Sequence, residues 1–466
     1  MATKQPPRRL RTSPVDPALA RFVRQKMRDT GTPGVAVGVL HKGRAFAQGF
    51  GVRSIEAPDP VDEETLFQIG STTKTFTAAA IMRLVERKEL DLDVPVRRYV
   101  KALRLKDPDV LKKVTLRHLL THTGGWAGDF FPDTGRGEDA VARLVEGLAK
   151  IPQLTPLGEV WHYNNAGFVL AGHVLEKVTG QTYEAAVREL IVDPLGMTRS
   201  FFFADEANAY RIAAGHIART FKSRQHEVAK PWALDRSSGP SGAIIADVVD
   251  QLRWAQFNMG DGRAPNGTRL LKKSTMKMMQ TPQAPAGSIA DHVGISWLLT
   301  DVDGTWIVAH GGTTNGHLSA FDMVPERDFA VTVLTNSSRG GEVHRAVVAR
   351  ALELYIGLKH VPPDPRPDDD LDVTRYAGRF VDAFKTWGIV LEPRGRRLHG
   401  HFEILDPEDD DGPLPPNFHL AFFDTDRTVI QGGRLGGLTA EFLRDKAGRV
   451  QWIRYGGRIL RRSRAS

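Results

Sequence analysis

One segment organises this chain, and it reads Phe67-Gln68-Ile69-Gly70-Ser71-Thr72-Thr73-Lys74-Thr75-Phe76-Thr77-Ala78-Ala79-Ala80-Ile81-Met82. Ser71 and Lys74 lie three residues apart, so both side chains share one face if the segment is helical. The apolar positions that follow repeat at helical spacing, and no further charge occurs before Arg83. These features predict a buried helix with a lysine near its start. Burial lowers the pKa of a lysine, and a neutral amine beside a serine hydroxyl can accept the hydroxyl proton.

The same Ser-x-x-Lys pattern occurs a second time, as Ser274-Thr275-Met276-Lys277. Roughly two matches are expected by chance in a chain of this length and ordinary composition. The second match follows two further lysines, a cluster of charges that is typical of a solvated helix face. We therefore assign the catalytic hypothesis to Ser71 and Lys74, and a surface position to the second match.

The composition is that of a soluble globular protein. Of 466 residues, 41% are hydrophobic and 25% are charged, which allows two or three domains with ample core. The net charge of +8 is concentrated at the ends, in the N-terminal tail and in arginines such as Arg449, Arg454 and Arg458 near the C-terminus. No aromatic platform or nucleic-acid motif accompanies these cations, so we expect solvated termini and no nucleic-acid partner.

Several classes of site are excluded or disfavoured. The chain has no cysteine, which excludes disulfides, thiolate metal sites and a cysteine nucleophile. His399 and His401 lack a further ligand pattern and are expected on an exposed strand pair, so we expect no metal and no cofactor. Residues 1–27 contain no apolar signal segment and no stretch reaches membrane-spanning length, which predicts a cytoplasmic protein without a membrane partner. No feature of the sequence indicates an oligomeric state.

The order of expected helices and strands predicts an α/β fold. Residues 1–15 are rich in proline and arginine and are expected to be disordered. Asp16 and Pro17 mark the start of a helix that Gly31 ends. Strands are expected at 35–40 and 44–50, helices through the middle of the chain, strands again at 293–299, 305–310, 318–324 and 329–334, and a helix at 342–355. Strands at both ends with helices between them predict one sheet that is closed by the two ends of the domain.

A domain boundary is expected after the last of these helices. Residues 361–372 contain several prolines and a run of aspartates, a composition typical of a linker. Residues 373–466 contain short strand-like segments separated by glycine-rich turns, which predicts a small antiparallel β-barrel. The catalytic domain would then cover residues 16–360.

Three short motifs follow one another along the chain: Ser71-x-x-Lys74, Tyr163-Asn164-Asn165 and His310-Gly311-Gly312-Thr313. Together with the segments 116–125 and 193–197, they resemble the serine β-lactamase and penicillin-binding-protein superfamily. Within it, the pattern is most similar to the class C-like, peptidase S12 branch, which includes family VIII esterases, D-aminopeptidases and penicillin-binding-type thioesterases. The C-terminal barrel resembles the lipocalin-like domain that several of these proteins carry. The resemblance implies the β-lactamase/penicillin-binding-protein fold, an antiparallel sheet flanked by helices with a helical subdomain, followed by that barrel.

The resemblance also implies a role for the residues of the first two motifs. Ser71 would attack an acyl carbonyl and carry the acyl group, and Lys74 would activate it. Tyr163 would relay the proton to the leaving group, with the pKa of its phenol lowered by nearby cations. Asn165 would hold Lys74 and a substrate amide.

The third motif would complete the site. Backbone N–H groups of Ser71 and Thr313 would form the oxyanion hole, and His310 would bond Tyr163 or bind substrate. The expected substrate-binding residues are Gly311, Gly312, Trp126 and Phe130. The two aromatic residues in that set could equally belong to the core, and His122 is expected to be structural.

One departure from the family pattern bears on the substrate. In β-lactamases the third motif begins with lysine, whereas here it begins with His310. A neutral histidine is a weaker anchor for a free carboxylate than an ammonium is, so β-lactamase activity is expected to be weak or absent. The leading hypothesis is a serine hydrolase of esters or amides with a small-molecule or peptide acyl substrate. Two alternatives stay open, namely acyl transfer to an amine and a ligand sensor that stays acylated. The barrel is expected to limit substrate size rather than to contribute catalytic groups.

Overall fold

The computed structural model describes residues 9–220, 223–366, 371–406 and 414–463. Its centre is a mixed sheet with the strand order β1-β3-β2-β14-β13-β12-β11-β10-β9. The strands are β1 (Thr12–Ser13), β2 (Gly34–His41), β3 (Arg44–Gly51), β9 (Ala284–Pro285), β10 (His292–Val293), β11 (Leu298–Val302), β12 (Thr305–Thr313), β13 (Leu318–Val324) and β14 (Phe329–Thr335). β2 pairs with β14, so the two ends of the domain meet in the middle of the sheet, as predicted.

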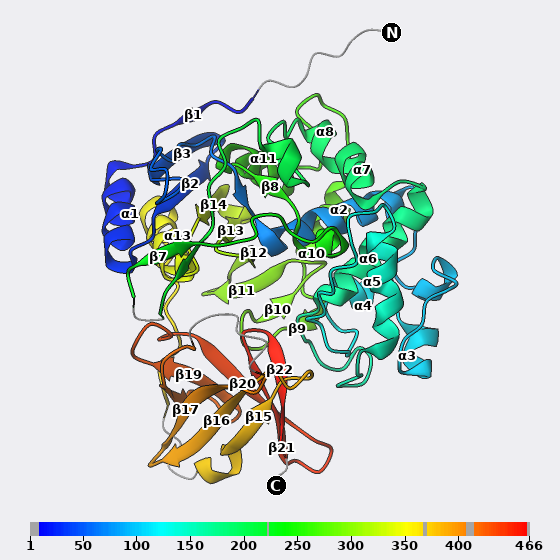
Figure 1. The fold of residues 1–466 in the computed structure, drawn as a ribbon, viewed down its shortest axis with the longest axis vertical. Coiled ribbons are helices and arrows are strands. Elements are labelled where there is room, and N and C mark those ends of the chain that lie inside the picture. Colours follow the sequence, from blue (N-terminus) through cyan, green and yellow to red (C-terminus); the bar gives the residue numbers. More distant parts are fainter. Residues whose placement is uncertain (1–8, 221–222, 367–370, 407–413, 464–466) are drawn as a thin grey trace.

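Helices cover both faces of this sheet, as Figure 1 shows. Along β2, Val35, Val37 and Val39 enter the core beneath α1 (Pro17–Thr30) and α13 (Gly340–Ile356). Ala36 and Leu40 point the other way, into the core that contains α2 (Thr73–Glu86) and α11 (Val248–Met259). The period of two along a strand explains why this nearly continuous apolar run is buried on both faces. The structure thus confirms the predicted fold class.

The other elements form the helical subdomain and short connections. They are α3 (Pro108–Lys113), α4 (Leu116–Leu120), α5 (Ala140–Gly147), α6 (Asn165–Thr179), α7 (Tyr183–Val187), α8 (Asp193–Leu195), α9 (Ala204–Ala207), α10 (Gly239–Gly242), α12 (Lys273–Met279), β4 (Phe67–Gln68), β5 (Ser200–Phe201), β6 (His216–Ala218), β7 (His226–Val228) and β8 (Ile245–Ala246). α6 is buried along most of its length and packs against α2, α4 and α5. It therefore places the second motif beside the first.

The N-terminal segment differs from its prediction. The Asp16 carboxylate accepts the Ala18 N–H at 2.7 Å and caps α1, and Gly31 ends the helix with a φ of 73°, both as expected. Residues 1–8 lie outside the described residues, but residues 9–15 are ordered, and β1 lies parallel to β3. An ion pair of 2.5 Å between Arg9 and the buried carboxylate of Asp247 holds residues 9–15 against the domain. The predicted disorder is therefore wrong for residues 9–15.

The C-terminal strands close into an antiparallel barrel in sequence order, with β22 returning to β15. They are β15 (Gly378–Val381), β16 (Trp387–Arg394), β17 (Arg397–Ile404), β18 (Phe418–Phe422), β19 (Arg427–Gln431), β20 (Thr439–Arg444), β21 (Val450–Tyr455) and β22 (Arg458–Arg462). Phe402, Phe418 and Phe422 fill the interior, whereas Phe423 and Trp452 are only half-buried. Residues 357–366, before the barrel, form no helix or strand. No helix among the described residues is long and apolar enough to cross a membrane.

Candidate active site

Ser71 and Lys74 lie at the start of α2, where a short 3₁₀ turn (Gly70–Thr72) leads into the helix. The Nζ of Lys74 lies 2.9 Å from the Oγ of Ser71 and donates to the Ser241 carbonyl at 2.7 Å. Lys74 is fully buried. This burial, with a smaller effect of the positive charge of Arg458, lowers the pKa of Lys74 well below its usual 10.5. Because Ser241 accepts one N–H, a lone pair of the neutral amine is free to face Ser71.

The third motif lies directly against the nucleophile. β12 carries His310 to Thr313 past the 3₁₀ turn, and the Thr72 hydroxyl lies 3.1 Å from that of Ser319 on β13. The Ser319 hydroxyl in turn donates to the Ile69 carbonyl at 2.8 Å. A Cβ on Gly312 would lie 2.6 Å from the Ser71 nitrogen, so the two backbones touch here. This close approach supports the predicted oxyanion hole of Ser71 and Thr313, which stays a prediction.

The glycine at position 312 gives the first testable prediction. Gly312→Ala should lower acylation of Ser71 about 100-fold, the usual cost of one lost oxyanion donor, because the new Cβ would displace the Ser71 N–H. The measurement is the rate of acylation by an activated ester. Gly341→Ala is the matched control, because the nearest atom there is 3.7 Å away. Equal rates for Gly312→Ala and the control would contradict the assignment.

Tyr163 reaches the same point from the start of α6. The Nζ of Lys74 lies 5.0 Å from the centre of its ring, and hydrogen bonding with Ser71 is one of the effects on the pKa of its phenol. The predicted lowering of the phenol pKa is wrong in direction. Burial raises the pKa of Tyr163 above its usual value of 10, and the bond to Ser71 and the charge of Arg458 offset this only in part. Tyr163 is therefore a neutral phenol at pH 7, able to donate and accept a proton in one hydrogen-bonded chain.

Asn165 has a different partner from the one expected. Its side-chain amide donates to Asp129 at 2.6 Å, and among the described residues no hydrogen bond joins it to Lys74. The preceding residue, Asn164, is the helix cap, because its side chain accepts the Gly167 N–H at 2.7 Å. Within the second motif, Asn164 therefore caps α6 and Asn165 contacts Asp129.

Two histidines border the site. His310 bonds the Gly311 carbonyl through Nδ1 at 2.7 Å, and burial lowers its pKa to about 3, so the ring is neutral at pH 7. Its ring centre lies 6.2 Å from that of Tyr163, without the expected hydrogen bond between them. His122 stacks on Tyr163 at 4.4 Å and accepts the Asn164 N–H at 2.9 Å, in keeping with its expected structural role.

Both aromatic candidates for substrate binding, Trp126 and Phe130, pack in or against the main core. Trp126 is 2% exposed and belongs to the main core, and its carbonyl accepts the side-chain amide of Asn164 at 2.8 Å. Phe130 is half-buried and packs against the same core. Their contact with substrate stays a prediction. The second Ser-x-x-Lys match lies on α12 with Ser274 and Lys277 both exposed, as expected for a solvated face.

Arg458 is a site residue that the sequence analysis missed. It was assigned to a solvated terminus, yet its guanidinium lies 4.6 Å from the centre of the Tyr163 ring and bonds Asp129 at 2.9 Å. Arg454, assigned likewise, is 4% exposed and bonds the Ala286 carbonyl at 3.2 Å. Both belong to β21–β22 of the barrel, which packs against the catalytic domain. Tertiary contact rather than position in the chain therefore buries Arg454 and brings Arg458, whose side chain is still 35% exposed, to the site. Arg458 and Asp129 are 329 positions apart, which no local pattern can join.

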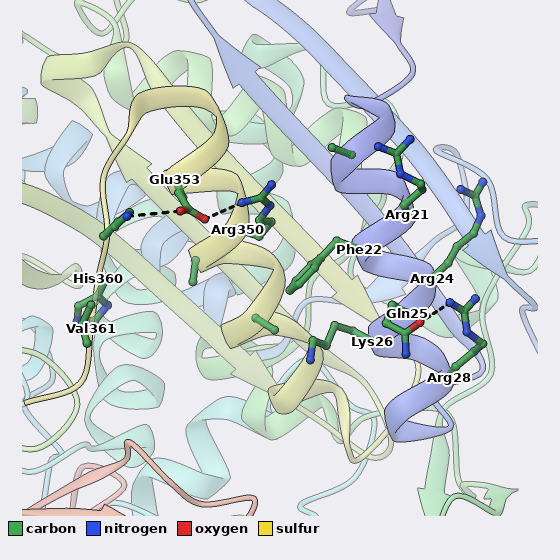
Figure 2. Close-up of a pocket in the computed structure, with 14 residues that line it drawn as sticks. Arg21, Phe22, Arg24, Gln25, Lys26, Arg28, Arg350, Glu353, His360 and Val361 are labelled. Carbon is green, nitrogen blue, oxygen red and sulfur yellow. Dashed lines mark hydrogen bonds and ion pairs between the residues drawn. The ribbon is translucent and has the colours of Figure 1, made fainter.

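A groove of about 1050 Å³ lies away from these residues, between α1 and α13 (Figure 2). Cations such as Arg21, Arg24 and Arg350 line it, and Glu353 pairs with Arg350 at 2.7 Å. The groove is open to solvent, and no serine, threonine or tyrosine is among the described residues that line it. Chemistry rather than size therefore makes the surroundings of Ser71 the candidate active site.

Comparisons with known proteins agree with this geometry. The family model described as Beta-lactamase matches residues 19–355. The chain is 33% identical to "Penicillin-binding protein 4" of Amycolatopsis lactamdurans, over 78% of this chain and 92% of that protein. It is 25% identical to "Unguisins hydrolase ungD" of Aspergillus violaceofuscus, over 83% of this chain and 79% of that protein. The solved structure of SurE superposes with a TM-score of 0.73 at 25% identity, covering 96% of this chain and 98% of SurE. The chain therefore belongs to the beta-lactamase family, in the superfamily of serine hydrolases that also contains penicillin-binding proteins and esterases.

Proposed function

We propose that this protein is a peptidase S12-like serine hydrolase that cleaves esters or amides through a Ser71 acyl-enzyme. The observation that carries the proposal is the Lys74 amine, fully buried and 2.9 Å from the Ser71 hydroxyl. Lys74 takes the Ser71 proton as Oγ bonds the acyl carbon, and the oxyanion forms beside the Ser71 and Thr313 N–H groups. The proton passes through Tyr163 to the leaving group, whose bond to the acyl carbon breaks. Water then releases the acid by the reverse relay.

The neutral ring of His310 bears on the choice of substrate. At the head of the third motif it supplies no positive charge at pH 7, because burial keeps its pKa near 3. A free carboxylate on the substrate thus lacks the ammonium anchor that the lysine of β-lactamases would give. The proposal therefore includes weak or absent β-lactamase activity. The test compares the hydrolysis of nitrocefin with that of p-nitrophenyl esters and of D- and L-amino-acid amides.

Mass spectrometry distinguishes the proposal from its alternatives. A fluorophosphonate should label Ser71 stoichiometrically, and an activated ester should then give an acyl adduct that water removes rapidly. Loss of the adduct only to an added amine would instead identify an acyl transferase. The barrel favours acyl transfer as the second candidate function. The penicillin-binding-type thioesterases that the sequence resembles also pair a catalytic domain with a lipocalin-like domain. An adduct that persists would identify a ligand sensor.

Tyr163→Phe should slow acylation about 100-fold or more, the usual size of a general acid–base contribution, because it removes the relay hydroxyl beside Ser71. The readouts are the acylation rate and the melting temperature. Tyr183→Phe is the matched control, since that buried hydroxyl lies 2.8 Å from the Thr77 hydroxyl and does not contact Ser71. It should cost stability but change the rate only a few-fold. A Tyr163→Phe protein as active as the control would remove Tyr163 from the mechanism.

A further inference from the structure

The turn between β21 and β22 docks one end of the barrel on the second motif. The Tyr163 N–H donates to the Gly457 carbonyl at 2.9 Å, and the Ile459 N–H donates to Nδ1 of His162 at 3.1 Å. Gly457 has a φ of 79°, and a Cβ there would lie 3.0 Å from the ring of Trp161. The backbone N–H of Tyr163 and the side chain of His162 are therefore held by the barrel and not only by the catalytic domain.

Arg458, the residue after this turn, reaches further into the site. Its Nε and Nη2 donate to the two carboxylate oxygens of Asp129 at 2.9 and 3.2 Å. The same Asp129 accepts the side-chain amide of Asn165 at 2.6 Å. A two-point bond between guanidinium and carboxylate fixes both planes. The chain of contacts therefore runs from the barrel through Asp129 to Asn165, while the guanidinium covers the Tyr163 ring.

We infer that Arg458 is a positioning residue of the active site, supplied by the barrel, which orients Asn165 through Asp129 and holds Tyr163 against Ser71. The inference rests on the proposed function, because it concerns the same acylation step. It replaces the expectation that the barrel only limits substrate size. The catalytic centre is then shared between two domains, so the barrel is needed for chemistry as well as for selectivity.

The positive charge of Arg458 predicts an effect on the pH dependence of the rate that packing alone would not produce. The titratable groups that surround the Lys74 amine are Arg458, Asp129, Tyr163, His310 and His122. Of these, Arg458 lowers the pKa of Lys74 and Asp129 raises it, after the larger effect of burial. Loss of the cation at position 458 leaves Asp129 uncompensated. The pKa of Lys74 then rises, and the neutral base forms only at higher pH.

Arg458→Ala should therefore lower kcat/KM for an activated ester about 100-fold, the loss expected from misplacing the reacting groups. The acid limb of its pH–rate profile should shift to higher pH. Arg458→Lys should keep the wild-type acid limb but recover only part of the rate, because it keeps the charge and loses the two-point bond. Arg449→Ala is the matched control. It breaks another arginine–aspartate pair of the barrel, with Asp445, at a side chain 80% exposed, and should leave both quantities unchanged.

Three outcomes overturn the inference. The first is a wild-type rate and profile in Arg458→Ala. The second is a loss of rate with an unmoved acid limb, and the third is a shift that Arg458→Lys does not reverse; either would reduce Arg458 to a packing role. Melting temperatures of all variants identify any that fail to fold, and the lysine variant retains most of the packing. Failure of the wild type to label at Ser71 would instead reject the proposed function.

Discussion

Ser71→Ala is expected to abolish turnover, with kcat reduced by at least about four orders of magnitude. Loss of a catalytic nucleophile usually has this effect, and what activity remains comes from binding and the oxyanion donors. Labelling by a fluorophosphonate should disappear as well. The fold should be unaffected, because the change removes one partly exposed hydroxyl. The measurements are steady-state hydrolysis of a p-nitrophenyl ester and intact-protein mass after labelling.

The second Ser-x-x-Lys match supplies the control for this experiment. Ser274 is exposed on α12, so Ser274→Ala should leave turnover and labelling within about threefold of wild type. The opposite result, with Ser274→Ala inactive and Ser71→Ala active, would show that the wrong match was chosen. Activity in both variants would point to a different nucleophile altogether.

Lys74→Ala should slow acylation by at least about two orders of magnitude, because it removes the general base 2.9 Å from the Ser71 hydroxyl. In wild type, the neutral amine is the active form, so the rate should rise as pH increases through the pKa of Lys74 and then level off. Since that pKa lies well below 10.5, the plateau should begin well below pH 10.5. Single-turnover acylation across pH measures both effects.

Lys277→Ala provides the comparison, as an exposed lysine in the second match, and should keep the wild-type profile. The sign of the pH dependence is decisive for the role of Lys74. A rate that falls as pH rises through the same range would mean that the ammonium form is active, and the lysine would then act as a charge rather than as a base.

Local features of the fold follow from the sequence because neighbouring residues determine them. Asp16, Pro17 and Gly31 set the ends of α1 through a cap, a preset φ and a left-handed residue. The predicted strand from Val293 to Leu299 was wrong, however. Ser296 adopts a φ of 69° and donates its N–H to the Leu120 carbonyl at 2.9 Å, which separates β10 from β11. That partner lies on another element, so no local pattern marks the break.

The sequence by itself determined the pairing of the candidate nucleophile with its base, because Ser71 and Lys74 are one helical turn apart and an apolar run buries the lysine. It also determined the family and the presence of a barrel. Only the tertiary structure decided the surroundings of that pair. The pKa of the Tyr163 phenol is raised because the effect of burial exceeds that of the nearby cation. Arg458 reaches the site from the far end of the chain. Charge and desolvation act through space, so their balance depends on which distant residues the fold brings together.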